Sequence, residues 1–377
     1  MMKSVLDAEI ENKIIFLRVD WNVPFESGKI LNDSRIRATL PTINYLLSKN
    51  CRIVVGTHLG RPEGDVVPQL STKILAMRFS ELIKTKICAT DYVIESAVKK
   101  QIDRLGPKEI IVIGNLRWHA EEETNNLAFA HILSSYAEAF VNDAFAVCHR
   151  AHASVEAITN FLPGYAGLLL EKEVNSLRIL TQRPRHPFVL VLGGAKIKDK
   201  VGLIKKFAPM VDKILVGGAI ANTLRYFQGH DIGNSYCETD LKNTALGIFA
   251  VAKNKIVLPN DEIRKDLSGG KFSIMDIGPQ TIAKFKEYIS PAKTIFWNGN
   301  MGYSEDNEYE TGTLEIAKAI RDNSYTKIIA GGDTAGFIDS HNMVSGYSFV
   351  STGGGAALEF LAGAELPALK ALGYYNK

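Results

Sequence analysis

The chain has 377 residues, of which 46% are hydrophobic and 23% are charged, proportions typical of a folded globular protein. Its formal net charge of +3 is small for this length and no long run of like charges occurs, so the composition gives no reason to expect binding to nucleic acid or to a membrane. No apolar stretch reaches the ~18 residues of a membrane span, and the start MMKSVLDAEIENK is too polar for a signal peptide, so we expect a cytoplasmic protein.

Short β-branched apolar runs, bounded by Gly, Pro, Asn or Asp, recur along the chain, with amphipathic helical segments such as residues 40–50 and 312–323 between most of them. Strands that alternate with helices predict βαβ units and parallel sheets covered on both faces. Roughly nine strands exceed one sheet of about five or six, so the pattern favours two α/β halves. The runs are residues 14–20, 52–58, 109–115, 139–145, 187–194, 213–218, 255–259, 294–299 and 327–333.

The junction between the two halves is expected near residue 167. A helix is predicted from about Leu168 to Leu180, and Pro184 and Pro187 then mark a turn before the next strand. The pattern therefore predicts a first domain over residues 1–167 and a second domain that begins with this connecting helix.

Cationic side chains collect where the strands of the first half end, and ligands of open α/β sheets bind at that edge. An arginine binds phosphate or carboxylate through a planar fork of donors, so these residues are candidates for a cage around a small polyanion. The alternative is that each is a solvated surface charge, but their repeated position at successive strand ends argues against it. The candidates are Arg35, Arg61, Arg117, Arg150 and His58, with Asp20 and Asn22 beside them.

The second half carries glycines in the corresponding positions. Gly193 and Gly194 follow a strand and precede Lys196 and Lys200 at the predicted start of a helix, where free N–H groups attract phosphate. A tight turn before a lysine-rich, solvated helix face is the alternative. The P-loop spacing G-x-x-x-x-G-K-[ST] does not occur in the chain, which argues against a Walker-type ATPase.

Two further glycine-rich segments lie near the C-terminus, and the first of them, around Asp333, follows a predicted strand. Ser351 or Thr352 is a predicted N-cap before the glycine triplet 353–355. Each glycine costs a helix about 1 kcal/mol relative to alanine, so the triplet indicates backbone that a ligand approaches, with a flexible loop as the alternative. Asp333 could hold Mg²⁺, which takes one or two protein carboxylates plus phosphate oxygens, or it could cap the next helix.

Taken in order, these segments resemble the phosphoglycerate kinase family from end to end. Eight motifs carry the resemblance, and eight matches in family order leave little room for chance. They are RVDWNVP (Arg18–Pro24), THLGRP (Thr57–Pro62), LRWHAEEE (Leu116–Glu123), VNDAFAVCHRAHAS (Val141–Ser154), LGGAKIKDK (Leu192–Lys200), DIGPQT (Asp276–Thr281), GGDTA (Gly331–Ala335) and STGGGAALE (Ser351–Glu359).

The resemblance implies two Rossmann-like α/β domains, each a mainly parallel sheet flanked by helices, joined by the helix 168–180 with a cleft between them. Residues 1–167 would bind 3-phosphoglycerate, residues 168–362 would bind nucleotide, and residues 363–377 would fold back toward the first domain. The implied reaction is reversible phosphoryl transfer between ATP and the carboxylate of 3-phosphoglycerate, giving ADP and 1,3-bisphosphoglycerate, in glycolysis and gluconeogenesis. The implied enzyme is a Mg²⁺-dependent monomer.

The resemblance also implies a role for each motif residue. The residues expected to bind 3-phosphoglycerate are Asp20, Asn22, Arg35, His58, Arg61, Arg117 and Arg150. Those expected at the nucleotide are Gly193, Lys200, Gly217, Gly218, Asn298, Glu305, Gly332, Asp333 and Thr334, with Asp333 on the magnesium side and Glu305 at the ribose. Those expected around the phosphoryl group in transfer are Arg35, Lys196, Gly353, Gly354 and Gly355.

The chemistry of this reaction fits the absence of an obvious catalytic base. The acceptor carboxylate is already ionised at neutral pH, so catalysis reduces to in-line positioning and neutralisation of charge. Because the two ligands would bind to separate domains, we expect the cleft to close to align them and exclude water. The helix 168–180 is expected to be one hinge element.

The loop Trp297–Glu305 departs from the family pattern, which usually reads W-N-G-P-x-G-V-F-E where this chain has W-N-G-N-M-G-Y-S-E. Asn300 in place of proline predicts a freer loop, and Tyr303 and Ser304 bear on nucleotide affinity. A catalytically weak nucleotide- or partner-binding relative is therefore the alternative to an active kinase. Against it stands the retention of Arg35, Lys196, Lys200 and Asp333.

Overall fold

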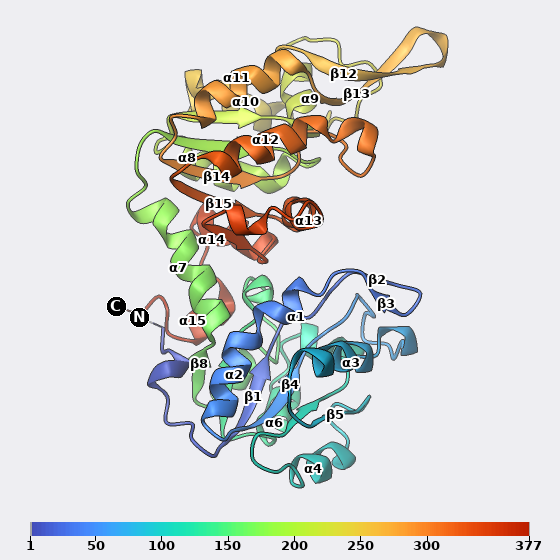
Figure 1. Cartoon of the computed structure of the whole chain (residues 1–377), viewed down its shortest axis with the longest axis vertical. Helices are drawn as coiled ribbons and strands as arrows, with labels where there is room; N and C mark the ends of the chain where they lie inside the picture. Colours follow the sequence, from blue (N-terminus) through green and yellow to red (C-terminus); the bar gives the residue numbers. More distant parts are fainter. Residues whose placement is uncertain (1, 377) are drawn as a thin grey trace. The chain divides into compact units, whose positions relative to one another are not determined.

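The computed structural model describes residues 2–376 and divides the chain into two compact units. The first unit runs to Val174 and takes in the chain again from Glu365, and the second unit is Asn175–Ala364. The division falls inside helix α7 (Leu168–Gln182), whose first residues belong to one unit and whose later residues belong to the other. Each unit is built on its own six-stranded sheet (Figure 1).

The sheet of the first unit is parallel throughout, with the strand order β5-β6-β4-β1-β7-β8. Its central strands β1 (Ile14–Arg18) and β4 (Arg52–Gly56) pair Ile14 with Arg52 and Arg18 with Gly56. Both strands are largely buried apolar runs, as expected of parallel strands covered by helices on two faces. The remaining strands are β5 (Ile87–Ala89), β6 (Ile110–Val112), β7 (Ala139–Asn142) and β8 (Gly164–Ala166).

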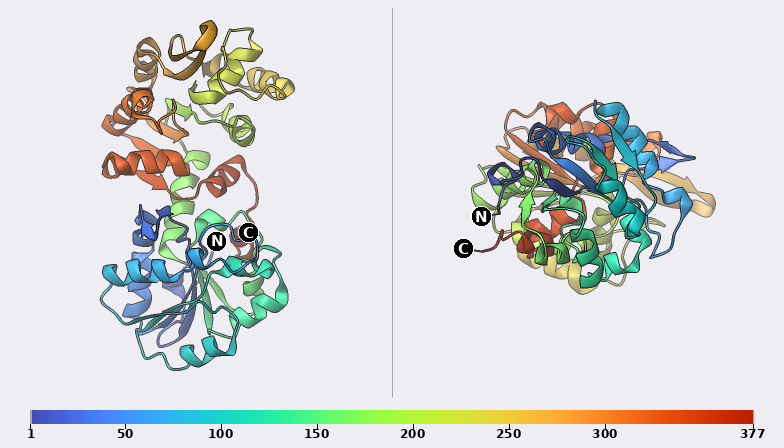
Figure 2. Two further views of the ribbon diagram at one scale, coloured as in Figure 1. Left: turned by 90° about the vertical axis from the view of Figure 1, so that its right-hand side faces the viewer. Right: turned by 90° about the horizontal axis from the view of Figure 1, so that it is seen from below.

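Helices flank this sheet, and their apolar sides complete its core (Figure 2). Leu46 of α2 and Phe79 of α3 are fully buried there, and the Phe79 ring packs 4.9 Å from that of Trp21. A proline in the first turn of α2 is tolerated because that turn needs no N–H donor. The helices are α1 (Ser34–Ala38), α2 (Leu40–Ser48), α3 (Lys73–Leu82), α4 (Ser96–Ile102), α5 (Ala120–Glu123), α6 (Leu127–Ser134) and α15 (Pro367–Ala371).

The sheet of the second unit is also parallel, in the order β11-β10-β9-β14-β15-β16. All five residues of β9 (Phe188–Leu192) and of β14 (Thr294–Asn298) are buried. The other strands are β10 (Lys213–Val216), β11 (Ile256–Val257), β15 (Thr326–Ala330) and β16 (Phe349–Ser351). The helices are α8 (Val201–Phe207), α9 (Gly218–Phe227), α10 (Lys242–Ala252), α11 (Pro279–Ile289), α12 (Thr311–Asp322), α13 (Gly332–Ser340) and α14 (Gly355–Ala362).

The two sheets confirm the predicted α/β class, and all nine predicted strands are present. The sequence pattern missed the short strands β5, β8 and β16, which lie at the edges of the two sheets. It also missed two antiparallel hairpins, β2 (Phe25–Glu26) with β3 (Lys29–Ile30), and β12 (Glu262–Leu267) with β13 (Lys271–Ile277). The β12–β13 hairpin projects from the second unit (Figure 1), so β12 is mostly exposed and charged rather than apolar.

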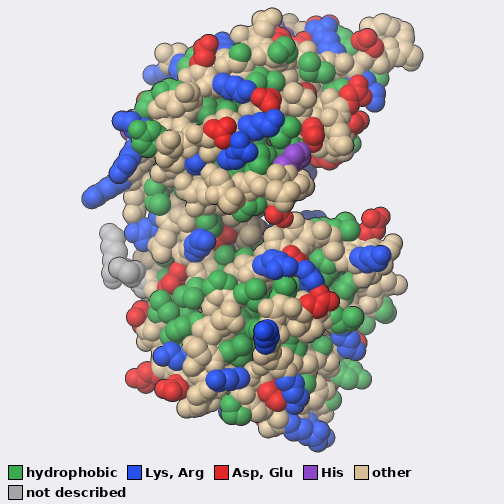
Figure 3. All heavy atoms as spheres, viewed as in Figure 1, with side chains coloured by type: hydrophobic (Ala, Val, Ile, Leu, Met, Phe, Trp, Pro, Cys, Tyr) green, Lys and Arg blue, Asp and Glu red, His purple; other side chains and the backbone are tan. Residues whose placement is uncertain are grey.

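Charged side chains of both signs are interspersed over the face of each unit drawn in Figure 3. Among residues 2–376, no helix combines the length and the apolar character needed to cross a bilayer.

A buried carboxylate holds the start of α7. Asp143, which follows β7, is 1% exposed, and its Oδ1 accepts hydrogen bonds from the backbone N–H groups of Leu169 (2.9 Å) and Leu170 (3.1 Å). These donors lie in the first helical turn, where no helical carbonyl can reach them. Burial raises the pKa of Asp143 to about 6, and the hydrogen bonds from α7 offset only part of this effect.

We predict that Asp143→Asn changes how stability depends on pH. The pKa of Asp143 is about 6 in the folded protein and close to 3.8 in the unfolded chain, so the native state binds the extra proton between these values. The free energy of unfolding of the wild type therefore contains a contribution that falls as the pH rises from about 4 to about 6. Asparagine lacks this contribution. Urea unfolding of the wild type and the variant at about pH 4.5 and about pH 7 measures how the free energy of unfolding of each protein changes with pH.

Asp143→Ala is the control, because it removes both the carboxylate and the helix cap. Its stability should lie about 1–2 kcal/mol below that of Asp143→Asn at both pH values, since asparagine keeps the cap. An asparagine variant whose stability changes with pH as much as that of the wild type would contradict the account of the buried carboxylate.

Candidate active site

The seven residues predicted to bind a polyanion all lie in the first unit, at the carboxyl edge of its sheet. Strands β6, β4, β1 and β7 are neighbours in the sheet, so the loops that follow them meet along one edge. Asp20 and Asn22 follow β1, His58 and Arg61 follow β4, Arg117 follows β6, Arg150 lies beyond β7, and Arg35 is on α1.

Asp20 is the centre of one group in this cluster. Its carboxylate forms an ion pair with Arg35, and its Oδ1 lies 3.8 Å from Nδ1 of His58. Oδ1 of Asn22 accepts a hydrogen bond from the backbone N–H of Gly60 (2.9 Å), which ties the loop after β1 to the loop after β4. Four of the seven predicted residues are thus brought together.

The other arginines gather near Glu123. Its Oε1 lies 3.3 Å from Nε of Arg117 and 4.0 Å from Nη1 of Arg150. Arg117 is nearly buried, and its Nη1 donates to the carbonyl of Gly60 (3.2 Å). Arg61 is exposed and has no hydrogen bond or ion pair within residues 2–376. The edge therefore holds more arginines than carboxylates, and the excess positive charge favours a small anion.

The sequence reasoning missed a buried arginine beneath this cluster. Arg18 is fully buried, its Nε donates to Oγ of Ser154 (2.8 Å), and its Nη2 lies 3.4 Å from Nδ1 of His58 and 3.9 Å from Oε1 of Glu122. Ser154 donates in turn to the same Glu122 oxygen (2.6 Å). The signal was available, because a charged residue at the end of a buried apolar run requires partners.

His58 is a neutral hydrogen-bonding group in this environment. Burial lowers its pKa well below the usual value, and the positive charges of Arg18, Arg117 and Arg35 lower it further. Because Nδ1 faces the guanidinium of Arg18, Nδ1 accepts and Nε2 carries the proton. The imidazole can therefore donate a hydrogen bond to an anionic ligand.

The second unit collects its candidate residues at the carboxyl edge of its own sheet. Strands β10, β9, β14, β15 and β16 are consecutive in that sheet, and a glycine-containing segment follows each of them. These segments and the last residue of β14 supply Gly217, Gly218, Gly193, Asn298, Gly332, Asp333, Thr334 and the triplet 353–355.

Hydrogen bonds join the polar residues at this edge. Nζ of Lys200 donates to Oδ1 of Asn298, whose Nδ2 donates to the carbonyl of Ala330 (2.6 Å). Oγ1 of Thr334 accepts from the backbone N–H of Gly299 (2.9 Å). Burial lowers the pKa of Lys200 to about 8, although nearby aspartates oppose the effect. Lys200 is thus a partly desolvated cation, a state that an anionic ligand would stabilise.

Backbone segments approach one another here more closely than side chains permit. A Cβ on Gly193 would lie 2.1 Å from the carbonyl oxygen of Asn300. Gly218 has a φ of +60° and donates to the carbonyl of Met301 (2.7 Å). These two positions therefore require glycine.

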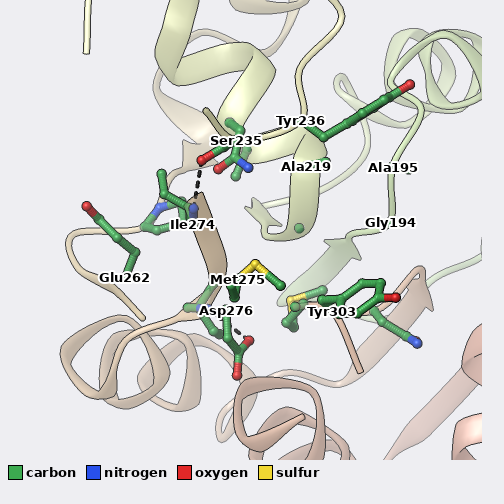
Figure 4. Close-up of a pocket in the computed structure, with 18 of the residues that line it drawn as sticks. Gly194, Ala195, Ala219, Ser235, Tyr236, Glu262, Ile274, Met275, Asp276 and Tyr303 are labelled. Atoms are coloured by element: carbon green, nitrogen blue, oxygen red, sulfur yellow. Dashed lines mark hydrogen bonds between the residues drawn. The ribbon is translucent and has the colours of Figure 1, made fainter. Parts of the chain in front are cut away.

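A cavity of about 430 Å³ lies within the second unit beside these loops (Figure 4), a volume within the range of small-molecule sites. Of the residues predicted at the nucleotide, Gly218, Glu305 and Asp333 line it. Both carboxylates are exposed, and neither forms a hydrogen bond or ion pair within residues 2–376. The prediction missed the walls formed by α9 and β13, because the hairpin that carries β13 was not recognised.

The predicted helix caps near the C-terminus are wrong. Ser351 ends β16, and Gly354, with a φ of 48°, is the N-cap of α14 in place of Ser351 or Thr352. The alternative that Asp333 caps a helix is also wrong, because Gly331 is the N-cap of α13 and Asp333 lies inside the first turn. In each case a glycine reaches a backbone conformation that the polar residue would adopt at a cost.

Only one of the two lysines expected at a helix start lies there. Lys200 is the N-cap of α8, whereas Lys196 lies earlier in the loop after β9. Lys196 is exposed, does not line the cavity and has no hydrogen bond or ion pair with the residues that the structure describes.

The loop after β14 is tied down by hydrogen bonds. Nδ2 of Asn300 donates to Oγ of Ser304 (2.6 Å), and the backbone N–H of Met301 donates to Oγ1 of Thr313 (3.0 Å). Two residues that depart from the family pattern therefore bind each other. Contrary to the freer loop expected from Asn300, this side chain is 8% exposed and restrains the loop.

Two parallel α/β units, one with a cationic edge and the other with a glycine-lined cavity beside the half-buried Lys200, define the class of two-domain α/β phosphotransferases. The family model described as phosphoglycerate kinase matches residues 5–364. The chain therefore belongs to the phosphoglycerate kinase family.

Individual relatives agree with this assignment. The chain is 41% identical to a phosphoglycerate kinase of Coprothermobacter proteolyticus and 38% identical to one of Pelotomaculum thermopropionicum, with 98% of each chain covered in both cases. Among solved structures it is similar to phosphoglycerate kinase from Coxiella burnetii (TM-score 0.85, 34% identity, 100% of both chains). It is also similar to that from Pyrococcus horikoshii (TM-score 0.88, 32% identity, 99% of this chain and 98% of the other).

We predict that the imidazole of His58 stays neutral around neutral pH and titrates below the ordinary range of histidine, because burial and the neighbouring arginines lower its pKa. The chemical shift of its ring C–H in NMR spectra measures this directly. Arg18→Met removes the nearest positive charge, so the pKa of His58 should move upward in that variant. A wild-type midpoint near the ordinary value of about 6.5 would contradict the prediction.

We predict that Asn300→Ala and Ser304→Ala each weaken MgADP binding by about 3- to 10-fold, because each frees the loop that lines the cavity. The double variant should bind no more weakly than either single variant, since both break the same hydrogen bond. Isothermal titration calorimetry on the four proteins completes the cycle. If the losses of MgADP binding free energy in the two single variants add up in the double variant, the two side chains act separately.

Proposed function

We propose that the chain is an active phosphoglycerate kinase that transfers a phosphoryl group reversibly between ATP and the carboxylate of 3-phosphoglycerate. The observation that carries the proposal is the separation of two complementary sites. A cluster of arginines occupies the sheet edge of one unit, and a glycine-lined cavity near the half-buried Lys200 occupies the sheet edge of the other.

The cluster in the first unit suits 3-phosphoglycerate, whose phosphate and carboxylate are both anionic. Arginine forks bind such groups through paired charge-assisted hydrogen bonds, and neutral His58 adds a donor. Asp20 and Asn22 hold the loops and can accept from the substrate hydroxyl. The proposed ligand set is Asp20, Asn22, Arg35, His58, Arg61, Arg117 and Arg150.

The cavity in the second unit suits a nucleotide whose phosphates lie toward Lys200 and Asn298. Glycine backbone permits close approach at Gly193, Gly217 and Gly218. Thr334 and Gly332 complete the phosphate end, and exposed Glu305 is placed to meet the ribose. The low pKa of free Lys200 supports this assignment, because bound phosphates would restore its full charge.

Mg²⁺ fits this site as a partner of the nucleotide. Among residues 2–376, no group of three or more His, Cys, Asp or Glu is arranged to hold a metal ion. The exposed carboxylate of Asp333 on the cavity wall is a single ligand, and Mg²⁺ commonly takes one carboxylate with phosphate oxygens. Asp333 would hold the ion, which would neutralise negative charge on the phosphates.

The transfer itself needs no general base. The acceptor carboxylate of 3-phosphoglycerate is ionised at neutral pH and attacks the γ-phosphorus directly, while the bond to the ADP oxygen breaks on the opposite side. Arg35 and Lys196 would neutralise the equatorial oxygens, and the backbone N–H groups of the segment 353–355 would donate to them. Exposed Lys196 makes no hydrogen bond or ion pair with residues 2–376 and so is available for this role.

Because the two ligands are assigned to different units, we propose that transfer requires closure of the units, with α7 as one hinge element. Closure aligns the reactants and excludes water, which would otherwise hydrolyse the acyl phosphate. In the cell we expect a cytoplasmic monomer that acts in glycolysis and gluconeogenesis.

A coupled assay of ADP formation tests this proposal. The purified chain with MgATP should form ADP only when 3-phosphoglycerate is present, at a kcat typical of kinases, about 1–100 s⁻¹ or higher. Tight MgADP binding without 3-phosphoglycerate-dependent turnover would instead support a nucleotide-binding relative.

We predict that Lys196→Ala and Arg35→Ala lower kcat by about 100-fold or more, with smaller changes in KM. Each removes a charge that acts mainly on the transferring phosphoryl group, and a 100-fold loss corresponds to about 2.7 kcal/mol. Steady-state kinetics measure both parameters, and Lys196→Arg is the control that keeps the charge. Ordinary turnover in an alanine variant would remove that residue from the mechanism.

A further inference from the structure

One wall of the cavity carries a side-chain amide that makes no hydrogen bond within residues 2–376. Asn222, on α9, is 5% exposed and lines the cavity. Its amide makes no hydrogen bond to any residue between 2 and 376. Because its donor and its acceptor are unused by the protein, this amide is available to a ligand in the cavity.

The local structure of α9 does not depend on this amide. Thr223, the next residue, has its hydroxyl fully engaged, since it donates to the carbonyl of Ala219 (3.1 Å) and accepts from the N–H of Glu238 (3.1 Å). Asn222 has no comparable contact, so its side chain contributes to the cavity rather than to the helix.

Gly218, Asn222 and Arg225 follow one face of α9, because residues four and seven apart lie on the same side of a helix. Gly218 belongs to the glycine end of the cavity, beside Gly194 and the carbonyl of Asn300. At 1.5 Å per residue, Asn222 lies about 6 Å and Arg225 about 10 Å further along the axis. A nucleotide with its phosphates at the glycine end would therefore extend its base toward Asn222.

The far end of the cavity is closed by an ion pair. Nη1 of Arg225 donates to Oε2 of Glu262 (2.9 Å), and Nη2 of Arg264 donates to Oε1 (2.7 Å). Both oxygens of Glu262 are thus engaged within the protein. The amide oxygen of Asn222 remains as an acceptor that a ligand in the cavity can use, beside an amide donor on the same group.

The walls around this amide are apolar and suit a flat ring. Figure 4 shows Ile274 and Met275 on β13 along one side of the pocket, and Pro259, Ile277 and Met301 also line it. Apolar walls with few polar groups are typical of sites that enclose the faces of a ring and recognise its edge.

We propose that Asn222 hydrogen-bonds the edge of the nucleotide base and sets a preference for adenine. This inference deepens the proposed function and rests on it. An amide presents a donor and an acceptor side by side, and they match a ring nitrogen and the 6-amino group of adenine. The apolar walls hold the faces of the base while Asn222 reads its edge.

Calorimetric binding of two nucleotides tests the proposal. MgADP is compared with the magnesium complex of purine riboside diphosphate, which lacks only the 6-amino group. The wild type should prefer ADP by about 10-fold, the effect of one hydrogen bond. In Asn222→Leu the preference should fall to about 1- to 2-fold, while both nucleotides still bind through their phosphates.

Ser235→Ala is the matched control. Ser235 also lines the cavity, but its Oγ accepts from the N–H of Ile274 (2.7 Å) and donates to the carbonyl of Ile232, so it is not available to the base. This variant should keep the wild-type preference. If circular dichroism shows that Asn222→Leu is unfolded, Asn222→Ala takes its place.

A wild type that binds both nucleotides equally, or an Asn222→Leu variant that keeps the full preference, would overturn the inference. The 3-phosphoglycerate-dependent assay on the same samples separates the two proposals. Turnover without a preference for the 6-amino group refutes only the role of Asn222. A preference that depends on Asn222, without turnover, refutes the kinase function and leaves the role of Asn222 standing.

Discussion

The strands of a parallel sheet end at the same edge, and this constraint brings together nearly every candidate functional side chain of the chain. In the first unit the shared edge concentrates arginines around neutral His58, and the arginines repel one another unless carboxylates or a ligand lie between them. Asp20 and Glu123 supply part of that compensation from the edge, and Glu122 supplies more from beneath through Arg18. In the second unit the same constraint brings glycine-rich loops together, so this edge presents exposed backbone groups where the first unit presents charged side chains.

In both sites the protein supplies too little negative charge to balance the cationic side chains. The sites are therefore ready to bind an anionic ligand. Burial lowers the pKa of His58 and that of Lys200, because the protein around each group disfavours its charged form. An anion that binds beside either group supplies negative charge and so favours its charged form. A reaction whose acceptor is already a carboxylate then needs cations and oriented N–H groups rather than a base, which is the chemistry that these two edges offer.

The sequence predicted the strands and most candidate residues because both follow from local patterns. Apolar runs predict the buried strands, and polar residues directly after them predict positions such as His58 and Asn298. Residues that act through distant contacts were missed. Arg18 was quoted only as part of a motif, and Asn222 lies on a helix whose role depends on a hairpin that the pattern did not reveal. The caps at Gly354 and Gly331 were misassigned because a glycine can occupy backbone conformations that favour it over the usual capping residues.

The central claim is a division of labour in which one unit binds 3-phosphoglycerate and the other binds nucleotide. Separate calorimetric titrations of the two ligands into Arg117→Ala and Lys200→Ala test it most directly. The account predicts that Arg117→Ala loses at least about 10-fold in affinity for 3-phosphoglycerate and keeps its affinity for MgADP, while Lys200→Ala shows the reverse. A folded variant that loses both ligands, or that loses the ligand assigned to the other unit, would contradict it.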